Sequence, residues 1–195
     1  MTHSELPVVM ERAPELQRSI TLDEYHRMIE AGVFGEDEHV ELLDGVLVRM
    51  SPHSPAHAQV IARLTHAFVR ALGDAYVVRV QLPITLVPMS EPEPDFAIVT
   101  AEEAEAPEHH PQHPLLVVEV GVSSVEPDRT IKAELYARAR IPEYWLVDVP
   151  ARRVEVRTEP DSRRARYRKV SRRTRGTLVP VELGAPVLDI PSLFR

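Results

Sequence analysis

Apolar residues recur along the chain at two spacings, which separate helical from extended segments. A period of three to four residues predicts helices over about 21–31, 56–72 and 127–140. In the second of these, Leu64 and Phe68 fall on one face and should pack on the core. Alternating or continuous apolar runs predict strands. The expected strands are 40–43, 46–48, 76–81, 84–87, 95–99, 115–120, 143–149, 153–157, 165–171 and 178–181.

Residues between these segments carry signals of their own. Ser19 or Thr21 can cap the first helix, and Ser54-Pro55 can open the second. Asp44-Gly45 between two apolar runs predicts a tight hairpin, because both residues tolerate positive φ. The acidic, proline-containing segment 101–114 is expected to be a surface loop. The order of elements predicts a mixed α/β fold with one central sheet flanked by helices.

Length and composition restrict the class of protein. A chain of 195 residues is near the upper end for one domain, so we expect an arm over 1–18 and a single domain over 19–195. The chain has no cysteine, which excludes disulfides, thiolate zinc sites and a cysteine nucleophile. No apolar run approaches a membrane span, and the acidic start does not resemble a signal peptide. We therefore expect a cytoplasmic protein without a membrane partner.

Charge is unevenly distributed along the chain. The net charge is −7, yet the segment from Arg152 to Arg175 holds 11 basic and 3 acidic residues, a local charge of +8. Two interpretations remain open: exposure of two outer strands, or a strip that faces phosphate, which supplies most non-specific affinity for nucleic acid. On the second interpretation DNA is the partner, and Arg163, Arg164 and Arg166 are the candidate contacts.

Lysine is rare in a chain that otherwise uses arginine for positive charge. Arginine occurs 21 times, whereas the two lysines are Lys132 and Lys169. Lysine is a compact charge with a tunable pKa, and arginine is a planar fork that is always charged. This usage makes a retained lysine informative about function.

Three candidate catalytic residues fall on or beside the predicted sheet. Glu119 lies in 115–120, the most apolar strand, where a carboxylate is costly unless it is paired or binds a metal. A salt bridge, for instance to an arginine, would also explain it, and Pro-Asp at Asp95 is also ordinary turn chemistry. Lys132 lies on the following helix, four residues after Asp128 and on the same face. Together the two acids and the lysine could hold magnesium and polarise a phosphate or its attacking water.

Histidines give two further candidates. Glu108, His109, His110 and His113 have spacing like that of a metal site, but they lie in a proline-rich acidic loop without a fixed scaffold. We therefore do not expect a functional metal there. His57 lies near the start of the second helix, where a role near the site or an ordinary hydrogen bond would explain it.

An ordered string of short motifs runs through residues 20–160. Its main members are Glu91-Pro92-Glu93-Pro94-Asp95, Val117-Val118-Glu119-Val120, Ser123-Ser124, Asp128-Arg129-Thr130-Ile131-Lys132, Leu135-Tyr136 and Ile141-Pro142-Glu143-Tyr144-Trp145-Leu146-Val147-Asp148. The string resembles the bacterial Uma-two family, described as putative restriction endonucleases of the PD-(D/E)XK nuclease superfamily. Agreement extends to Tyr25, Glu41-Leu42-Leu43-Asp44-Gly45, Met50-Ser51-Pro52 and His57.

The resemblance implies a restriction-endonuclease-like core that hydrolyses phosphodiesters, with DNA as substrate and Mg²⁺ or Mn²⁺ as cofactor. It implies that Asp95 and Glu119 bind the metal and that Glu41 supplies a further ligand. The superfamily usually places a lysine two residues after the second acid, where this chain has Gly121. Lys132, reaching in from the helix, is the substitute that the family resemblance implies.

The resemblance also allows accessory roles for His57 and Asp128, and analogy with other nucleases of this fold suggests a homodimer. Two other classes of function remain open. One is a non-catalytic module that keeps the nuclease fold to bind nucleic acid or protein, and the other is a metal-dependent hydrolase of a small phosphoester. Whether Lys132 points at the acid pair separates the enzyme from the binding module.

Overall fold

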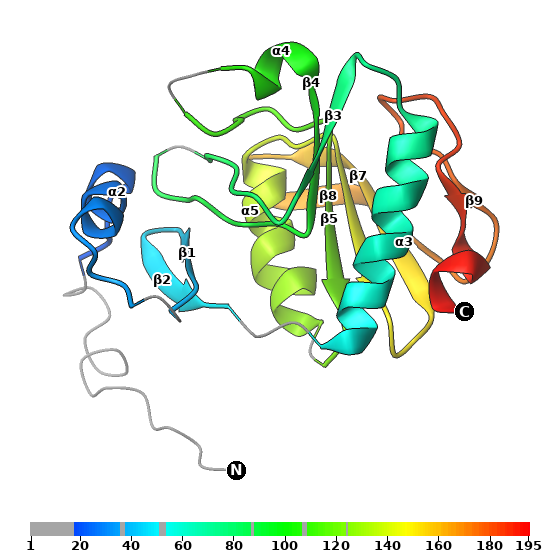
Figure 1. Ribbon diagram of the computed structural model, residues 1–195, viewed down its shortest axis with the longest axis horizontal. Coiled ribbons are helices and arrows are strands. Elements are labelled where there is room, and N and C mark those ends of the chain that lie inside the picture. Colours follow the sequence, from blue (N-terminus) through cyan, green and yellow to red (C-terminus); the bar gives the residue numbers. More distant parts are fainter. Residues whose placement is uncertain (1–17, 36–37, 51–53, 87, 107–108, 124) are drawn as a thin grey trace.

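A six-stranded mixed sheet forms the centre of the molecule (Figure 1). The computed structural model describes residues 18–35, 38–50, 54–86, 88–106, 109–123 and 125–195, so most of the expected arm over 1–18 lies outside the described residues. The strands, in spatial order, are β3 (Tyr76–Val80), β4 (Phe96–Thr100), β5 (Leu116–Gly121), β6 (Glu143–Asp148), β7 (Arg153–Asp161) and β8 (Arg166–Arg173). Strands β5 and β6 are parallel, and every other neighbouring pair in this sheet is antiparallel.

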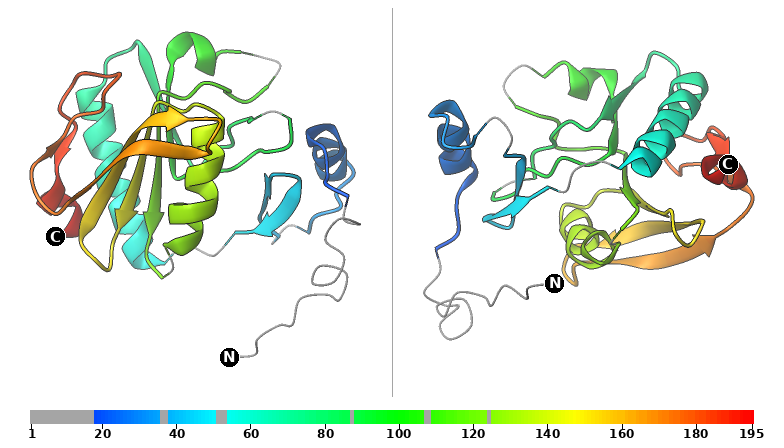
Figure 2. Two further views of the ribbon diagram at one scale, coloured as in Figure 1. Left: turned by 180° about the vertical axis from the view of Figure 1, so that it is seen from behind. Right: turned by 60° about the horizontal axis from the view of Figure 1, so that its bottom comes forward.

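Helices cover the two faces of this sheet (Figure 2). On one face α3 (Pro55–Ala71) packs Phe68 against Trp145 of β6. On the other face lies α5 (Ala133–Arg138), which is preceded by a π-helical turn over Asp128–Lys132. Because side chains alternate along a strand, Tyr144 of β6 points to the α5 side and contacts its Tyr136. The prediction of a mixed α/β fold with a central sheet flanked by helices is confirmed.

The N-terminal elements lie beside the α5 side of the sheet (Figure 1). Helix α2 (Leu22–Glu30) starts with a capping box between Thr21 and Glu24. A hairpin of β1 (Val40–Leu43) and β2 (Val46–Arg49) follows. Its two turn residues, Asp44 and Gly45, both have positive φ, as the sequence predicts. A β-bridge between Leu42 and Glu91 ties the hairpin to the segment that leads into β4.

Short elements complete the fold. They are α4 (Ala101–Ala104), the antiparallel pair of β9 (Thr177–Leu178) and β10 (Leu188–Asp189), and a 3₁₀ helix over Ile190–Phe194. In the part of the chain that the structure describes, no helix has the length and apolarity that a membrane crossing requires.

Two of the expected strands differ from the structure. Residues Ile84 to Leu86 form a buried loop, with a single bridge from Leu86 to Ser90, where a strand over 84–87 is expected. Flanking prolines remove backbone donors, so the apolar side chains enter the core without a ladder of hydrogen bonds. The expected strand 178–181 is reduced to Thr177–Leu178, since Pro180 interrupts it. Strand β7 is longer than expected and reaches Asp161.

Candidate active site

Six candidate residues from distant parts of the chain meet in one cavity at one end of the sheet. The cavity has a volume of about 580 Å³. Its lining includes Glu41 of β1, His57 of α3, Asp95 just before β4, Glu119 of β5, and Asp128 and Lys132 of the π-helical turn. The fold therefore brings together the expected metal ligands, the expected catalytic lysine and both accessory residues.

Glu119 occupies its place because of the alternation of β5. Val117, two residues earlier, lies in the core beneath α5, so Glu119 points to the same side. There its Oε1 accepts hydrogen bonds from Lys132 Nζ at 3.0 Å and from the Tyr136 hydroxyl at 2.7 Å. The buried carboxylate is thus paired, but with the lysine and not with an arginine.

Lys132 joins two acids that are far apart in the sequence. Its Nζ lies 3.0 Å from Glu119 Oε1 and 3.2 Å from Glu41 Oε2, and its side chain is only 10% exposed. The π-helical turn widens the helix at this point and aims Asp128 and Lys132 into the cavity. Such turns occur frequently at functional sites. Lys132 therefore points at Glu119, one member of the expected acid pair, and at Glu41.

Asp95 is held by the neighbouring strand and by α3. Its Oδ2 accepts a hydrogen bond from the backbone N–H of Val120 at 2.8 Å, and the imidazole Nε2 of His57 lies 3.0 Å from Oδ1. Gln81 Nε2 donates to Asp95 Oδ1 at 3.4 Å. These contacts fix the carboxylate beside the C-terminal part of β5, which is the strand that carries Glu119.

Burial and mutual repulsion dominate the electrostatics of the cavity. Burial raises the pKa of Glu119 to about 8, although Lys132 opposes the shift. Burial also raises the pKa of Asp128 to about 6, and Asp95 and Glu41 add to this shift. Burial opposes the charge of Lys132, but Glu119, Glu41 and Asp128 outweigh it and raise the pKa of the ammonium. Lys132 thus remains charged, while Glu119 and Asp128 retain protons more readily than acids in water.

These shifts predict that the free energy of unfolding falls as pH rises from about 5 to 8. A carboxylate with a raised folded-state pKa stabilises the fold below its unfolded pKa, and this contribution is lost as pH rises through the folded value. For Glu119 that window runs from 4.5 to about 8. Glu119→Gln should flatten the dependence, and Glu134→Gln on the exposed side of α5 should not. Urea unfolding at several pH values measures this, and parallel slopes for wild type and Glu119→Gln would contradict it.

The chemistry of the carboxylates fits a hard divalent cation. Asp95, Glu119 and Glu41 offer oxygen ligands in one cavity, and a cation would offset the repulsion from neighbouring acids that adds to the effect of burial on the pKa of Glu119. In the structure Glu41 and Glu119 both form ion pairs with Lys132. Within the described ranges no three His, Asp or Glu side chains are already gathered closely enough to hold an ion. A bound cation would therefore compete with Lys132 for the oxygens of these two carboxylates.

The structure does not bring the candidate DNA contacts to this cavity. Arg163 and Arg164 lie in the turn between β7 and β8, and Arg166 begins β8. This turn approaches the end of α5, where Arg140 Nε donates to Ser162 Oγ. The parallel register of β5 and β6 places Glu119 at the opposite end of the sheet from Glu143, where β6 begins. The three arginines thus lie at the end of the sheet away from the acids.

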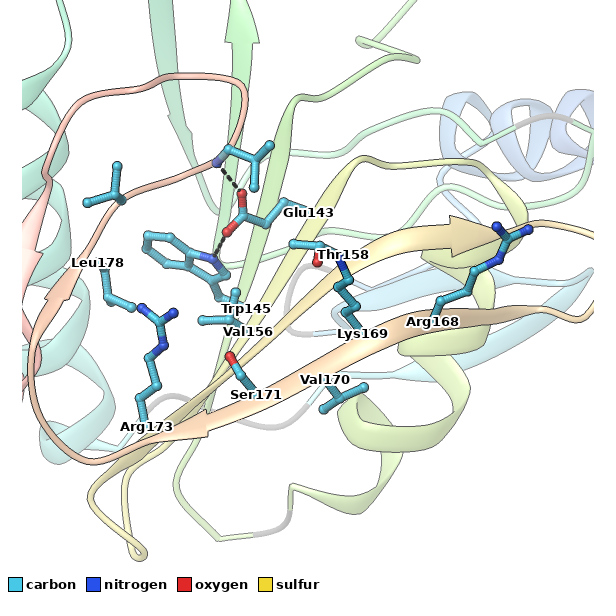
Figure 3. A pocket seen from close by; sticks show the side chains of 12 residues that line it. Glu143, Trp145, Val156, Thr158, Arg168, Lys169, Val170, Ser171, Arg173 and Leu178 are labelled. Atoms are coloured by element: carbon cyan, nitrogen blue, oxygen red, sulfur yellow. Dashed lines mark hydrogen bonds between the residues drawn. The ribbon is translucent and has the colours of Figure 1, made fainter.

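A second cavity, of about 560 Å³, lies beneath β8 (Figure 3). Arg168, Lys169 and Arg173 line it, and its floor is the buried carboxylate of Glu143. Glu143 accepts hydrogen bonds from Trp145 Nε1 at 2.5 Å and from the backbone N–H of Val181 at 2.6 Å. The carboxylate therefore anchors the segment after β9 and is already satisfied.

The histidine-rich loop also lies apart from the acids. His109 and His110 are exposed and line a different cavity, next to His26 and Glu91. Glu108 lies outside the described residues. These histidines therefore lie outside the cavity that holds the acids.

Two residues that contribute to the site had no assigned role from the sequence. Tyr136, which the sequence identifies only within a motif, is buried and donates its hydroxyl hydrogen to Glu119. Arg129 lies within the π-helical turn and binds Glu155 and Asp148, each at 3.0 Å. These two ion pairs fix the turn against β6 and β7. The sequence shows Arg129 between Asp128 and Lys132, but a helical wheel does not reveal its partners on the sheet.

Comparisons with known proteins agree with this architecture. A family model named Uma2, described as putative restriction endonuclease, matches residues 22–191. A crystal structure of a putative nuclease belonging to DUF820 from Anabaena variabilis ATCC 29413 superimposes with a TM-score of 0.73. The match has 14% sequence identity and covers 90% of this chain and 97% of that chain, so it shows a shared fold. Comparison with curated proteins gave no match.

Proposed function

Since the chain belongs to the Uma2 family of putative restriction endonucleases, we propose that it is a metal-dependent nuclease that hydrolyses phosphodiester bonds of DNA. The observation that carries the proposal is the buried contact of Lys132 with Glu119 and Glu41 in the cavity that Asp95 also lines. A module that only binds a partner has no need to bury a lysine among acids. Such a cluster is costly to desolvate, and buried charged groups of this kind are concentrated at functional sites.

Asp95, Glu119 and Glu41 are the proposed ligands of Mg²⁺ or Mn²⁺. When bound, the metal would polarise a phosphate oxygen and lower the pKa of water. His57 orients Asp95 through the contact at 3.0 Å, and the N–H of Val120 holds the same carboxylate. Tyr136 holds Glu119 from the α5 side. The protein thus fixes two carboxylates from opposite sides before any substrate arrives.

Lys132 is the proposed source of positive charge for the phosphate. The neighbouring acids keep it protonated, so it can stabilise negative charge that develops on phosphate oxygens. Asp128, whose pKa burial raises to about 6, lies in the same cavity and can exchange a proton near neutral pH. We assign Asp128 this accessory role.

Two measurements on one protein preparation test the proposal. Plasmid nicking should require Mg²⁺ or Mn²⁺ and stop when EDTA is added. The melting temperature should rise by roughly 5–10 °C at saturating Mn²⁺, from about 2.7 kcal/mol at a hundred times the dissociation constant. A matched increase in ionic strength with KCl is the control. A rise in melting temperature without cleavage of any DNA would favour the binding module. Absence of both responses at metal concentrations up to the millimolar range would overturn the metal site.

If the basic turn contacts phosphate apart from the cavity, neutralising it should weaken DNA binding in a salt-dependent way. Replacing Arg163, Arg164 and Arg166 with Gln should lower the slope of log affinity against log salt by about 0.9 for each phosphate of duplex DNA that the variant no longer neutralises. The control variant replaces three exposed arginines elsewhere with Gln, so its net charge changes by the same amount. These arginines are Arg18, Arg27 and Arg70. An unchanged slope in the first variant would assign the turn to a solvated outer surface.

A further inference from the structure

One wall of the acid-lined cavity is apolar. Val46, after the hairpin turn, is 52% exposed, and Ile131, in the π-helical turn, is 56% exposed. Both line the cavity that also contains Glu119 and Lys132. Leu43, Val48, Met50 and Val122 also line this cavity. Single exposed aliphatic side chains are ordinary on a protein surface, but here two of them line one concave site together with other apolar residues, as in pockets that bind a ligand.

The charges of the cavity do not suit a DNA duplex lying across it. Its described lining carries six carboxylates, on Glu41, Asp44, Glu93, Asp95, Glu119 and Asp128. Beside these acids it carries two permanent cations, Arg49 and Lys132. A duplex presents one phosphate charge for about every 1.7 Å of its axis and is held by rows of Arg and Lys. Here the arginine-rich turn lies at the other end of the sheet.

A single unpaired nucleotide matches both the charged part and the apolar part of the cavity lining. It brings one phosphate to the acids with their metal and Lys132, and it presents a base whose flat face is apolar. Every base has such a face, so contact of this kind tolerates any sequence. A base within a duplex must first leave its stack, at a cost of a few kcal/mol, whereas a base in a single strand or a frayed end is already available.

We propose that Val46 and Ile131 form a platform for an unpaired base, so that the site takes single-stranded or frayed DNA in preference to intact duplex. This inference rests on the proposed nuclease function and adds the class of substrate. Exposure of both side chains, their place in the same cavity as the acids, and the acidic lining support it.

The test measures binding separately from cleavage. Two short single-stranded oligonucleotides are compared. One carries 2-aminopurine, whose fluorescence reports a base entering a new environment, and the other has an abasic position in its place. Binding is measured with Mn²⁺ present in a Glu119→Gln background, where cleavage is not expected. Val46→Ser and Ile131→Ser should each weaken binding of the base-containing strand by about 5-fold and leave the abasic strand unchanged. Val69→Ser, an equally exposed change on α3, is the matched control.

Cleavage by otherwise wild-type protein completes the test. Single strands should be cut at least about 10-fold faster than a relaxed, covalently closed circular duplex, which has neither a loop nor a fraying end, given the cost of unstacking a base. Faster cutting of the duplex, or equal losses on base-containing and abasic strands, would overturn the platform while leaving the nuclease function standing. A shift from dimer to monomer in Val46→Ser and Ile131→Ser by sedimentation, with DNA binding unchanged, would assign the wall to a second copy of the chain. Absence of metal-dependent cleavage of every DNA would instead overturn the proposed function.

Discussion

Asp95→Asn is expected to lower the rate of metal-dependent DNA cleavage by about a thousandfold or more. A metal ion contributes several kcal/mol to a hydrolytic transition state, and each 1.36 kcal/mol is a factor of ten. The asparagine oxygen can still accept the hydrogen bond from Val120 N–H, so the change removes the charge and keeps the shape. Single-turnover cleavage of a labelled oligonucleotide measures the loss.

Asp74→Asn is the matched control for this change. Asp74 is exposed in the loop before β3, away from the cavity, so its loss of charge should leave the rate unchanged. A rate for Asp95→Asn equal to that of wild type, after repeated purification to exclude contaminating nucleases, would remove Asp95 from the proposed metal site. Equal losses in Asp95→Asn and Asp74→Asn would point to an effect on net charge.

Lys132→Met is expected to destabilise the metal-free protein by about 3 kcal/mol. Removing one partner of a buried ion pair leaves the other charge uncompensated, and such losses are typically about 3–5 kcal/mol. We expect the lower end, because burial already raises the pKa of Glu119 and the carboxyl can take up a proton. The melting temperature should fall by roughly 6–12 °C, at about 2–4 °C per kcal/mol for a chain of this size. The loss should be smaller at pH 5.5 than at pH 8.

The chain contains a matched control for this variant in its other lysine. Lys169 is 71% exposed and pairs with Glu159 at 2.5 Å, and surface pairs of this kind contribute little, so Lys169→Met should shift the melting temperature by less than about 2 °C. Lys132→Met should also bind Mn²⁺ more tightly than wild type, since Glu41 and Glu119 no longer hold the ammonium. Cleavage should nevertheless fall. Unchanged stability and unchanged cleavage in Lys132→Met would show that this lysine contributes neither to the fold nor to the reaction.

Local patterns predict the elements that carry the site. The alternation of Val117 and Glu119 along an apolar strand already implies a buried carboxylate, and Asp44-Gly45 predicts the hairpin that presents Glu41. These predictions succeed because alternation and turn chemistry depend on residues that are close in sequence. That Lys132 lies on the next helix is likewise visible from helical spacing.

Other features depend on contacts that a linear pattern does not contain. The π-helical turn at Asp128–Lys132 is held by Arg129, whose partners Glu155 and Asp148 lie on later strands. The loop at Ile84 has the apolar content of a strand, but no neighbouring strand pairs with it among the described residues. The number of arginines likewise reveals a basic segment without showing at which end of the sheet its turn lies. In each case the tertiary arrangement decides, and it follows from the register of β5, β6 and β7.

The outer edge of the sheet has a consequence for association between copies of the chain. Among the described strands, β8 pairs with β7 alone, and an unpaired strand edge is a template for pairing with another molecule. Five of its eight residues are cationic, which are Arg166, Arg168, Lys169, Arg172 and Arg173. Two such edges approaching each other would place these charges face to face, so the strand protects the protein from growing into aggregates edge by edge. We therefore expect a homodimer of this chain, if one forms, to use a different surface.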